Sequence, residues 1–245
     1  MKKLLLSAVL VCGAVSNSFA GIDFESKAMQ LAGEIVANPA AFFYDFQQDL
    51  EGTTPLPPGK SYGFQTGLFP TTIPMGYTNL SGKYRVHAEG RIAPGVPQLD
   101  LIGGYWNMIW AKMAANQSDD INSAKFNGYY LGFILSTSVS PRMRTFWGYK
   151  RSQLTADLKL DKAVDFMGTD VTSFNSGFKD DFFIVGIEHP KAVGKLWSMQ
   201  LNYGVREKVI STKVSWYGKY FEMGFNIFPE GVLVIHPVWN FHLNF

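Results

Sequence analysis

The sequence predicts an all-β protein: a transmembrane antiparallel up-and-down β-barrel of about ten strands (roughly eight to twelve), with a short N-terminal helical segment. Three observations predict it. Apolar and polar residues alternate along many short segments, as the side-chain period of two in a strand requires. Hydrophobic residues make up 47% of the chain and charged residues only 17%, against about 25% charged in a typical soluble protein. Beyond the N-terminus, no run of about 18 apolar residues could form a membrane-spanning helix. Lipid-facing residues of a barrel are spread one in two along its strands, so this composition suits a barrel in a bilayer.

The N-terminus has the pattern of a secretory signal peptide. Lys2 and Lys3 precede the apolar run 4–15, and small residues favour cleavage after Ala20. The run is too short for a membrane-spanning helix, and a short N-terminal anchor is the alternative. Cys12 lies inside this run, so we expect the processed chain to have no cysteine, disulfide or thiolate metal site.

The charge balance argues against a general nucleic-acid-binding role. The chain has 22 basic and 20 acidic residues, and loss of Lys2 and Lys3 with the signal peptide would leave 20 of each. A chain of this balance lacks the excess of positive charge that binding to phosphate backbones requires. We expect three parts: a signal peptide at 1–20, a helical segment and linker at 21–58, and one barrel domain at 59–245.

The segment before the barrel differs from the rest of the chain. Its apolar residues at helical spacings of four, three and four are Phe24, Ala28, Leu31 and Ile35. A second short apolar stripe predicts another helix, which Gly52 closes, and three prolines in 53–59 predict an extended linker. The segment is expected to plug the lumen, to cap the periplasmic mouth or to lie on the membrane surface. The simpler alternative is that it packs against the barrel without a function of its own.

The strands follow one another between turn residues. They are expected at residues 60–69, 82–92, 99–112, 126–136, 143–159, 181–188, 195–206, 209–217, 219–228 and 231–245. Residues 161–180 show no alternation, which predicts a long external loop. The pair Gly103-Gly104 is the expected place for a bulge that changes the phase of its strand.

The clearest internal strand, 82–92, carries a row of ionisable residues on one face. The row consists of Lys83, Arg85, His87, Glu89 and Arg91. A charge facing lipid costs about 2 to 4 kcal/mol at the middle of the bilayer, so the row is expected to face the lumen. It predicts either a cationic pore wall that favours anions or a packed interior in which these residues pair with acids such as Asp157. The full set of expected lumen-lining residues is Lys83, Arg85, His87, Glu89, Arg91, Asp157, Gln200, Asn202, Arg206, His236 and His242.

The last strand alternates most regularly. Its apolar face consists of Trp239, Phe241, Leu243 and Phe245. In this ending the sequence resembles the bacterial outer-membrane β-barrel proteins as a class, whose terminal strand typically ends in Phe. The resemblance implies that these four residues are the signal read by the barrel-assembly machinery, and that the protein lies in the lipid of the cell outer membrane. An edge strand of a soluble sheet is the alternative, but natural edges are usually blunted by charge or proline.

The residue spacing gives no support to an enzyme, metal site or cofactor. Outer-membrane phospholipases and omptin proteases place catalytic groups on barrels, but no serine, histidine or carboxylate spacing here resembles either family. His236 and His242 are about 20 Å apart along one strand, too far to share a metal ion. Glycine-rich phosphate loops and metal-binding triads are absent from the sequence. An enzyme is therefore the third hypothesis, and no cofactor is expected.

The expected function is passage or binding of small solutes across the outer membrane through a narrow polar lumen. About ten strands enclose a narrow lumen, whereas water-filled porins have 16 or more, so a closed or narrowly gated barrel is expected. The alternative is a structural or surface-contact (adhesion) barrel without an open channel, which would present 161–180 as its exposed loop.

Overall fold

The computed structural model describes residues 45, 47–49, 51–69, 71–73, 76–109, 121–166, 169–192, 195–229 and 234–245. The expected signal peptide and the first expected helix lie outside these residues. Asp45 and residues 47–49 are helical. Within the described residues, no helix has the length and hydropathy needed to cross a bilayer.

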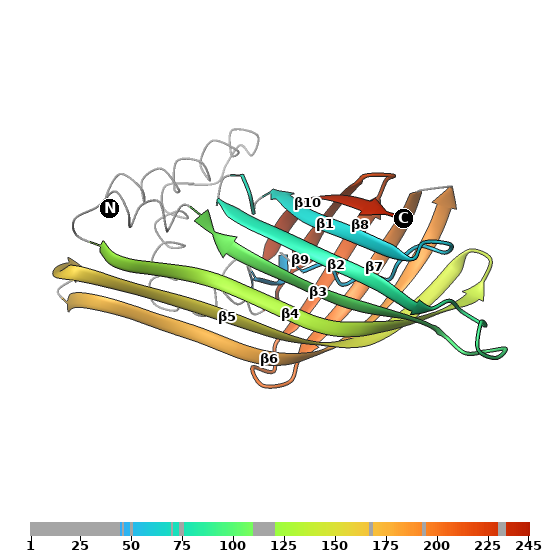
Figure 1. Ribbon diagram of the computed structural model, residues 1–245, viewed down its shortest axis with the longest axis horizontal. Helices are drawn as coiled ribbons and strands as arrows, with labels where there is room; N and C mark the ends of the chain where they lie inside the picture. Colours follow the sequence, from blue (N-terminus) through green and yellow to red (C-terminus); the bar gives the residue numbers. More distant parts are fainter. Residues whose placement is uncertain are drawn as a thin grey trace.

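In the described part of the chain, ten antiparallel strands close into a barrel (Figure 1), which confirms the predicted fold class. Each strand pairs with its neighbours in sequence, and pairing of the first with the last closes the wall. The strands are β1 (Tyr62–Phe69), β2 (Tyr77–His87), β3 (Gln98–Met108), β4 (Ile121–Ser140), β5 (Met143–Phe166), β6 (Thr169–Ala192), β7 (Lys195–Gly204), β8 (Ile210–Tyr217), β9 (Phe221–Ile227) and β10 (Ile235–Asn244).

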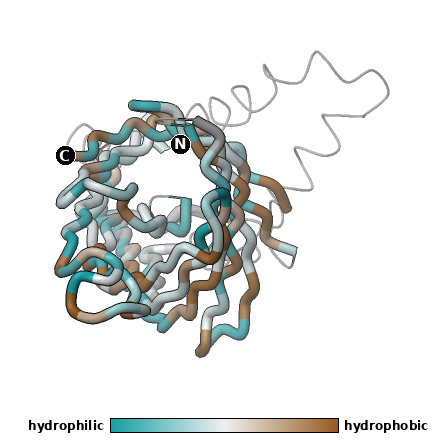
Figure 2. The backbone as a smooth tube through the Cα atoms, turned by 90° about the vertical axis from the view of Figure 1, so that its right-hand side faces the viewer, coloured by the Kyte–Doolittle hydropathy of each residue, from teal (hydrophilic) through white to brown (hydrophobic). Residues whose placement is uncertain are grey.

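The two faces of the wall differ in polarity and exposure. On β4, Ile134 is fully buried whereas Leu131 is 68% exposed. Figure 2 shows hydrophobic and hydrophilic residues alternating along the strands around the ring. Large apolar side chains that point outward include Tyr84, Leu101, Phe183, Met199 and Phe225. The outer surface of the barrel is therefore rich in apolar groups, as the alternation predicts.

The interior holds one apolar cluster among many polar and charged side chains. Strands β3 to β6 contribute a buried apolar cluster, which consists of Ile102, Tyr130, Ile134, Phe146 and Ile184. Strands β7 to β10 contribute mostly polar buried residues, which include Gln200, Asn202, Ser211, Lys213, Glu222, Asn226, His236 and Asn240. The polar side chains are stable inside the wall only if they find hydrogen-bond partners there.

The last strand closes the barrel against β1. Their pairing runs from Gly63 opposite Asn244 to Phe69 opposite Trp239. The ring of Tyr62 stacks on that of Phe245 with 5.0 Å between centroids. Trp239 and Phe245 are each half exposed on the outer face, so the chain ends with aromatic groups on the outside of the seam.

The expectation of a long loop at 161–180 is wrong. β5 continues to Phe166 and β6 begins at Thr169, so the two strands form a hairpin. Backbone hydrogen bonds make this ladder, and they do not need hydrophobic alternation where neither face is buried. β5 and β6 have 24 residues each, which corresponds to roughly 80 Å, and with β4 they extend beyond the other strands (Figure 1).

Several strand ends, and one expected bulge, also differ from the sequence prediction. β2 covers 77–87 and not 82–92, and its register shifts between Arg85 and His87. The pair Gly103-Gly104 holds no bulge, because its register is continuous with both neighbouring strands. Gly104 instead makes room for a large inward ring: an added Cβ would lie 2.6 Å from Cε1 of Tyr130.

Gly132 tests the close approach of β4 to β5. In Gly132→Ala, the new Cβ would overlap the carbonyl oxygen of Tyr149 and lie 2.7 Å from Cα of Lys150. Both are backbone atoms, so the strands must separate, and we expect a loss of about 1–3 kcal/mol in the free energy of unfolding. Urea unfolding in detergent micelles, followed by tryptophan fluorescence, measures it. The control is Gly82→Ala, whose Cβ meets nothing closer than 3.9 Å; equal losses in both variants would contradict the packing argument.

Candidate functional site

Residues of the N-terminal segment lie inside the barrel. We call residues 47–49 and 51–57 the luminal segment. Its side chains at 47–49, 51, 53, 54 and 56 are buried, and the segment forms hydrogen bonds with inward-facing groups of eight of the described strands. The candidate functional site is therefore the occupied lumen, not a surface cleft.

Glu51 anchors the luminal segment to β5. Its carboxylate forms an ion pair with Nζ of Lys150 and accepts a hydrogen bond from the hydroxyl of Ser152. Nε2 of Gln47 donates to the same carboxylate at 3.3 Å. Both side chains of the ion pair are 1% exposed, so each charge depends on the other for its neutralisation.

Asp49 anchors the segment to the opposite wall. Nδ2 of Asn226 on β9 donates to one carboxylate oxygen at 2.5 Å, and Nδ1 of His236 on β10 lies 2.7 Å from the other. The neighbouring Gln48 accepts a hydrogen bond from the hydroxyl of Ser211 on β8 at 2.7 Å. These contacts place Gln48 and Asp49 against β8, β9 and β10, whereas Gln47 faces Ser152 on β5.

Two threonines continue this contact toward β7 and β2. Nε2 of Gln200 donates to the hydroxyl of Thr53 at 2.7 Å and to Oδ1 of Asn202 at 2.5 Å. Nζ of Lys83 donates to the hydroxyl of Thr54 at 2.8 Å. The segment thus accepts hydrogen bonds from groups on several sides of the wall.

Leu56 is held through its backbone. Its N–H donates to Oδ2 of Asp100 at 2.7 Å. Its carbonyl oxygen accepts from Nη2 of Arg85 at 2.9 Å, from Nε2 of Gln98 at 3.1 Å and from Nη1 of Arg144 at 3.3 Å. The two arginines are paired with acids, Arg85 with Asp100 at 3.2 Å and Arg144 with Glu188 at 3.0 Å. The carbonyl oxygen of Leu56 therefore connects β2, β3 and β5.

Glu222 is the centre of a second buried network, on β9. It lies 2.7 Å from Nζ of Lys213 and accepts hydrogen bonds from Gln65, Tyr217 and Asn240 at 3.0, 2.6 and 2.9 Å. A buried carboxylate is stable in such a place when a cation and several donors surround it. This network joins the polar wall without taking part in the ion pairs of the luminal segment.

Most residues expected to line the lumen do lie inside. The buried or largely buried side chains are those of Lys83, Arg85, Gln200, Asn202, His236 and His242. His87, at the end of β2, is half-buried, and its Nδ1 lies 3.3 Å from the carbonyl oxygen of Ala88.

Four of the expected positions are corrected by the structure. Glu89 and Arg91 lie beyond the end of β2 and are exposed, because the chain leaves the wall after His87. Arg206 follows the end of β7, and its exposed Nη2 lies 3.4 Å from Oδ2 of Asp181. Asp157 points outward, because the alternate residues Leu154 and Ala156 are the buried ones. The expected row on one strand is therefore divided between the lumen and a connection.

Glu89 has a different role from the one expected. Its carboxylate accepts hydrogen bonds from the hydroxyls of Thr137 and Ser138 at 2.6 and 2.9 Å and from the N–H of Ser138 at 2.8 Å. Partial desolvation raises the pKa of this carboxyl, but the three hydrogen bonds outweigh it and hold the pKa below its usual value. Glu89 thus ties the β2–β3 connection to the end of β4.

Several buried charges were missed by the sequence analysis. They are Glu51, Asp100, Arg144, Lys150, Glu188, Lys213 and Glu222. A signal existed for some of them: Arg144 and Lys150 flank the largely apolar stretch 145–149, and Glu188 follows the apolar stretch 182–187. A charge that faces inward beside such a stretch needs a buried partner.

The arrangement suits packing and binding of polar groups. Within the described residues, no three His, Cys, Asp or Glu side chains are placed to hold a metal ion. No protein-family model matches the chain, and no curated protein matches it.

The Glu51–Lys150 pair gives a direct test of the luminal contacts. In Lys150→Met, the Glu51 carboxylate stays buried without its cation, so we expect the free energy of unfolding to fall by about 3–5 kcal/mol. Adding Glu51→Gln should recover much of this loss, because no unpaired ion remains. Urea unfolding in detergent of Lys150→Met, Glu51→Gln and the double variant gives the three losses of free energy that the cycle compares. Arg206→Gln, at an exposed ion pair, is the control and should change little; additive losses in the double variant would mean that the two residues do not interact.

Proposed function

We propose that the protein spans the bacterial outer membrane as a β-barrel and lets small polar solutes pass when the luminal segment leaves its place. The observation that carries this proposal is the polar character of the contact between the segment and the wall. Groups on the segment meet the wall mainly through hydrogen bonds and ion pairs.

A polar contact of this kind can be exchanged for water. A hydrogen bond inside the protein contributes only about 0.5–1.5 kcal/mol net, because water replaces it when it breaks. Release of the segment would leave polar groups such as Lys83, Gln200 and His236 facing water, and this is favourable for them. The released wall would then form a hydrated path along β7 to β10, while the apolar cluster on β3 to β6 bounds the other side.

The outer face supports insertion into a bilayer. Large apolar side chains are exposed there on every strand from β1 to β10, which would be unfavourable in water. β2, β3, β7 and β10 have 10 or 11 residues, close to the 9–11 that a tilted membrane strand needs. With this placement, lipid of the outer membrane and the barrel-assembly machinery are the proposed partners, the latter through Trp239, Phe241, Leu243 and Phe245.

The charges in the lumen indicate what kind of solute would pass. Three buried cations of the described wall lie beside acids of the wall, in Arg85–Asp100, Arg144–Glu188 and Lys213–Glu222. Lys83 bonds to Thr54 and Lys150 pairs with Glu51, both in the luminal segment. A wall with balanced charge does not build a strong field of one sign. We therefore expect weak selection, with a slight preference for anions because release of the segment leaves Lys150 without Glu51, and not the strong selection of a cationic pore wall.

A surface-contact barrel is the second candidate, and one observation favours it. The ladder between β3 and β4 ends at Asn107 and Asn127, and the ladder between β6 and β7 ends at Phe182 and Gly204. Beyond these pairs, β4 to β6 continue as a three-stranded sheet. Such a projection could present a surface to a partner outside the membrane, whether or not the barrel conducts.

A disulfide between the segment and the wall tests the proposed gate. A Cβ added at Gly52 would lie 3.3 Å from Cβ of Ser81 on β2, slightly closer than the roughly 3.5–4.5 Å found in disulfides. It would also lie 2.9 Å from Oε1 of Gln65, which is the end of a flexible side chain. The double variant Gly52→Cys with Ser81→Cys should therefore form a cross-link, and Cys12 is the only natural cysteine of the chain.

Planar-bilayer recording of the full chain gives the readout. The oxidised double variant should carry no current, and reduction with dithiothreitol should restore the intermittent current expected of the wild type. The single variants Gly52→Cys and Ser81→Cys are the controls, and their current should be the same with and without dithiothreitol. Current that is unaffected by the cross-link would contradict the gate, and absence of current in every form would contradict solute passage and leave the surface-contact barrel.

A further inference from the structure

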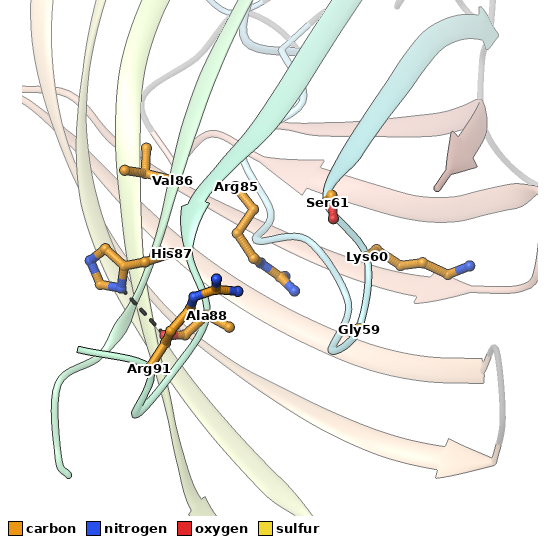
Figure 3. Close-up of a pocket in the computed structure, with 8 residues that line it drawn as sticks. All are labelled: Gly59, Lys60, Ser61, Arg85, Val86, His87, Ala88 and Arg91. Carbon is orange, nitrogen blue, oxygen red and sulfur yellow. Dashed lines mark hydrogen bonds between the residues drawn. The ribbon is translucent and has the colours of Figure 1, made fainter. Parts of the chain in front are cut away.

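A pocket of about 220 Å³ lies at the end of the barrel wall where β2 stops. It is formed between the chain that leads into β1 and the chain that leaves β2, and its lining includes Lys60, Arg85, Val86 and Arg91 (Figure 3). None of the acidic residues that the structure describes lines it. It lies apart from the hydrogen bonds made by residues 47–54, so ligand binding here can be measured whether or not the barrel conducts.

Arg85 forms the fixed side of this pocket. Its Nε is 3.2 Å from Oδ1 of Asp100, and its Nη2 donates to the carbonyl oxygens of Leu56 and Pro57 at 2.9 and 3.0 Å. The side chain is only 8% exposed. Its Nη1 has no hydrogen-bond partner among the described residues. The guanidinium is therefore held in one orientation while one of its nitrogens remains available.

Arg91 forms the exposed side. It has no ion-pair partner in the described part of the chain. In Figure 3 its guanidinium points toward that of Arg85, whereas Lys60 extends away from both and His87 turns to the other side of the strand. The nearest acids are engaged elsewhere, Asp100 with Arg85 and Glu89 with Thr137 and Ser138. Two cations thus share one space without an acid between them.

We propose that this pocket binds a phosphate group. Two guanidinium groups that face the same space repel each other unless an anion lies between them. The planar guanidinium of Arg91 can meet two oxygens of a phosphate in bidentate geometry, and a further phosphate oxygen can accept from Nη1 of Arg85. The volume leaves room for a small group attached to the phosphate.

The phosphate can come from a soluble solute or from a phospholipid headgroup. Val86 lines the pocket and is 49% exposed on the outer face of the wall, so the pocket opens beside the surface that lipid would cover. A soluble phosphate ester would reach it from the aqueous side. The chemistry recognised by Arg85 and Arg91 is the same in both cases.

Binding to the full chain in neutral detergent micelles tests the site. Isothermal titration calorimetry with glycerol 3-phosphate and inorganic phosphate, at an ionic strength fixed with chloride, addresses the soluble source. Native mass spectrometry after mixing with phosphatidylglycerol or phosphatidylcholine addresses the lipid source. Saturable binding of a soluble probe would support the site and indicate a soluble phosphate ester as its ligand. Selective retention of phosphatidylglycerol would support the site and indicate a lipid headgroup.

The variant Arg91→Gln separates the pocket from general attraction to positive charge. Arg91 is exposed in a connection, so the change leaves the wall intact, and loss of one charge-assisted contact should weaken binding about tenfold. Arg142→Gln, in the exposed β4–β5 turn at the same end of the barrel, is the matched control and should bind as the wild type does. Absence of binding to every probe, or equal weakening in the two variants, would overturn the proposal.

Discussion

A charge buried without a partner costs several kcal/mol, and the interior of this barrel is arranged around that constraint. The wall supplies pairs of its own, such as Arg144 with Glu188 and Lys213 with Glu222. It does not supply an acid for Lys150; that acid is Glu51 of the luminal segment. The segment is therefore part of the electrostatic balance of the wall, and the two structures stabilise each other.

The fold was predictable because a closed wall between two environments imposes a period of two on each strand. That period revealed ten strands, but it did not locate every strand end. Glu89 and Arg91 continue the alternation of β2 after the chain has left the wall, because a connection can alternate by chance. The hairpin of β5 and β6 shows the reverse case. Its backbone ladder pairs 164–166 with 169–171 and, after an irregularity, 152–159 with 173–180, although residues 161–180 lack the side-chain pattern. On β5 the alternation was read in the wrong phase, which placed Asp157 inside instead of outside.

The site was predictable only in part, for a related reason. Alternation places Lys83, Arg85 and Gln200 on the inner face, but the partner of each depends on the register between strands. Arg85 lies opposite Asp100 because the 88–97 connection sets the register of β2 against β3, and one sequence does not determine that register. Partners from the luminal segment are harder still to foresee, since an irregular chain has no period from which to read the direction of a side chain.

Arg85 belongs to two assemblies at once: it holds the carbonyl oxygens of Leu56 and Pro57, and it faces the pocket at the end of β2. If a ligand binds in the pocket, thermodynamic linkage couples its binding to detachment of the luminal segment. A ligand that fixes this guanidinium more firmly would change how readily the polypeptide inside detaches, and detachment would change the affinity for the ligand by the same factor. Through this one side chain, ligand binding at the end of the barrel would be coupled to release of the luminal segment from the interior.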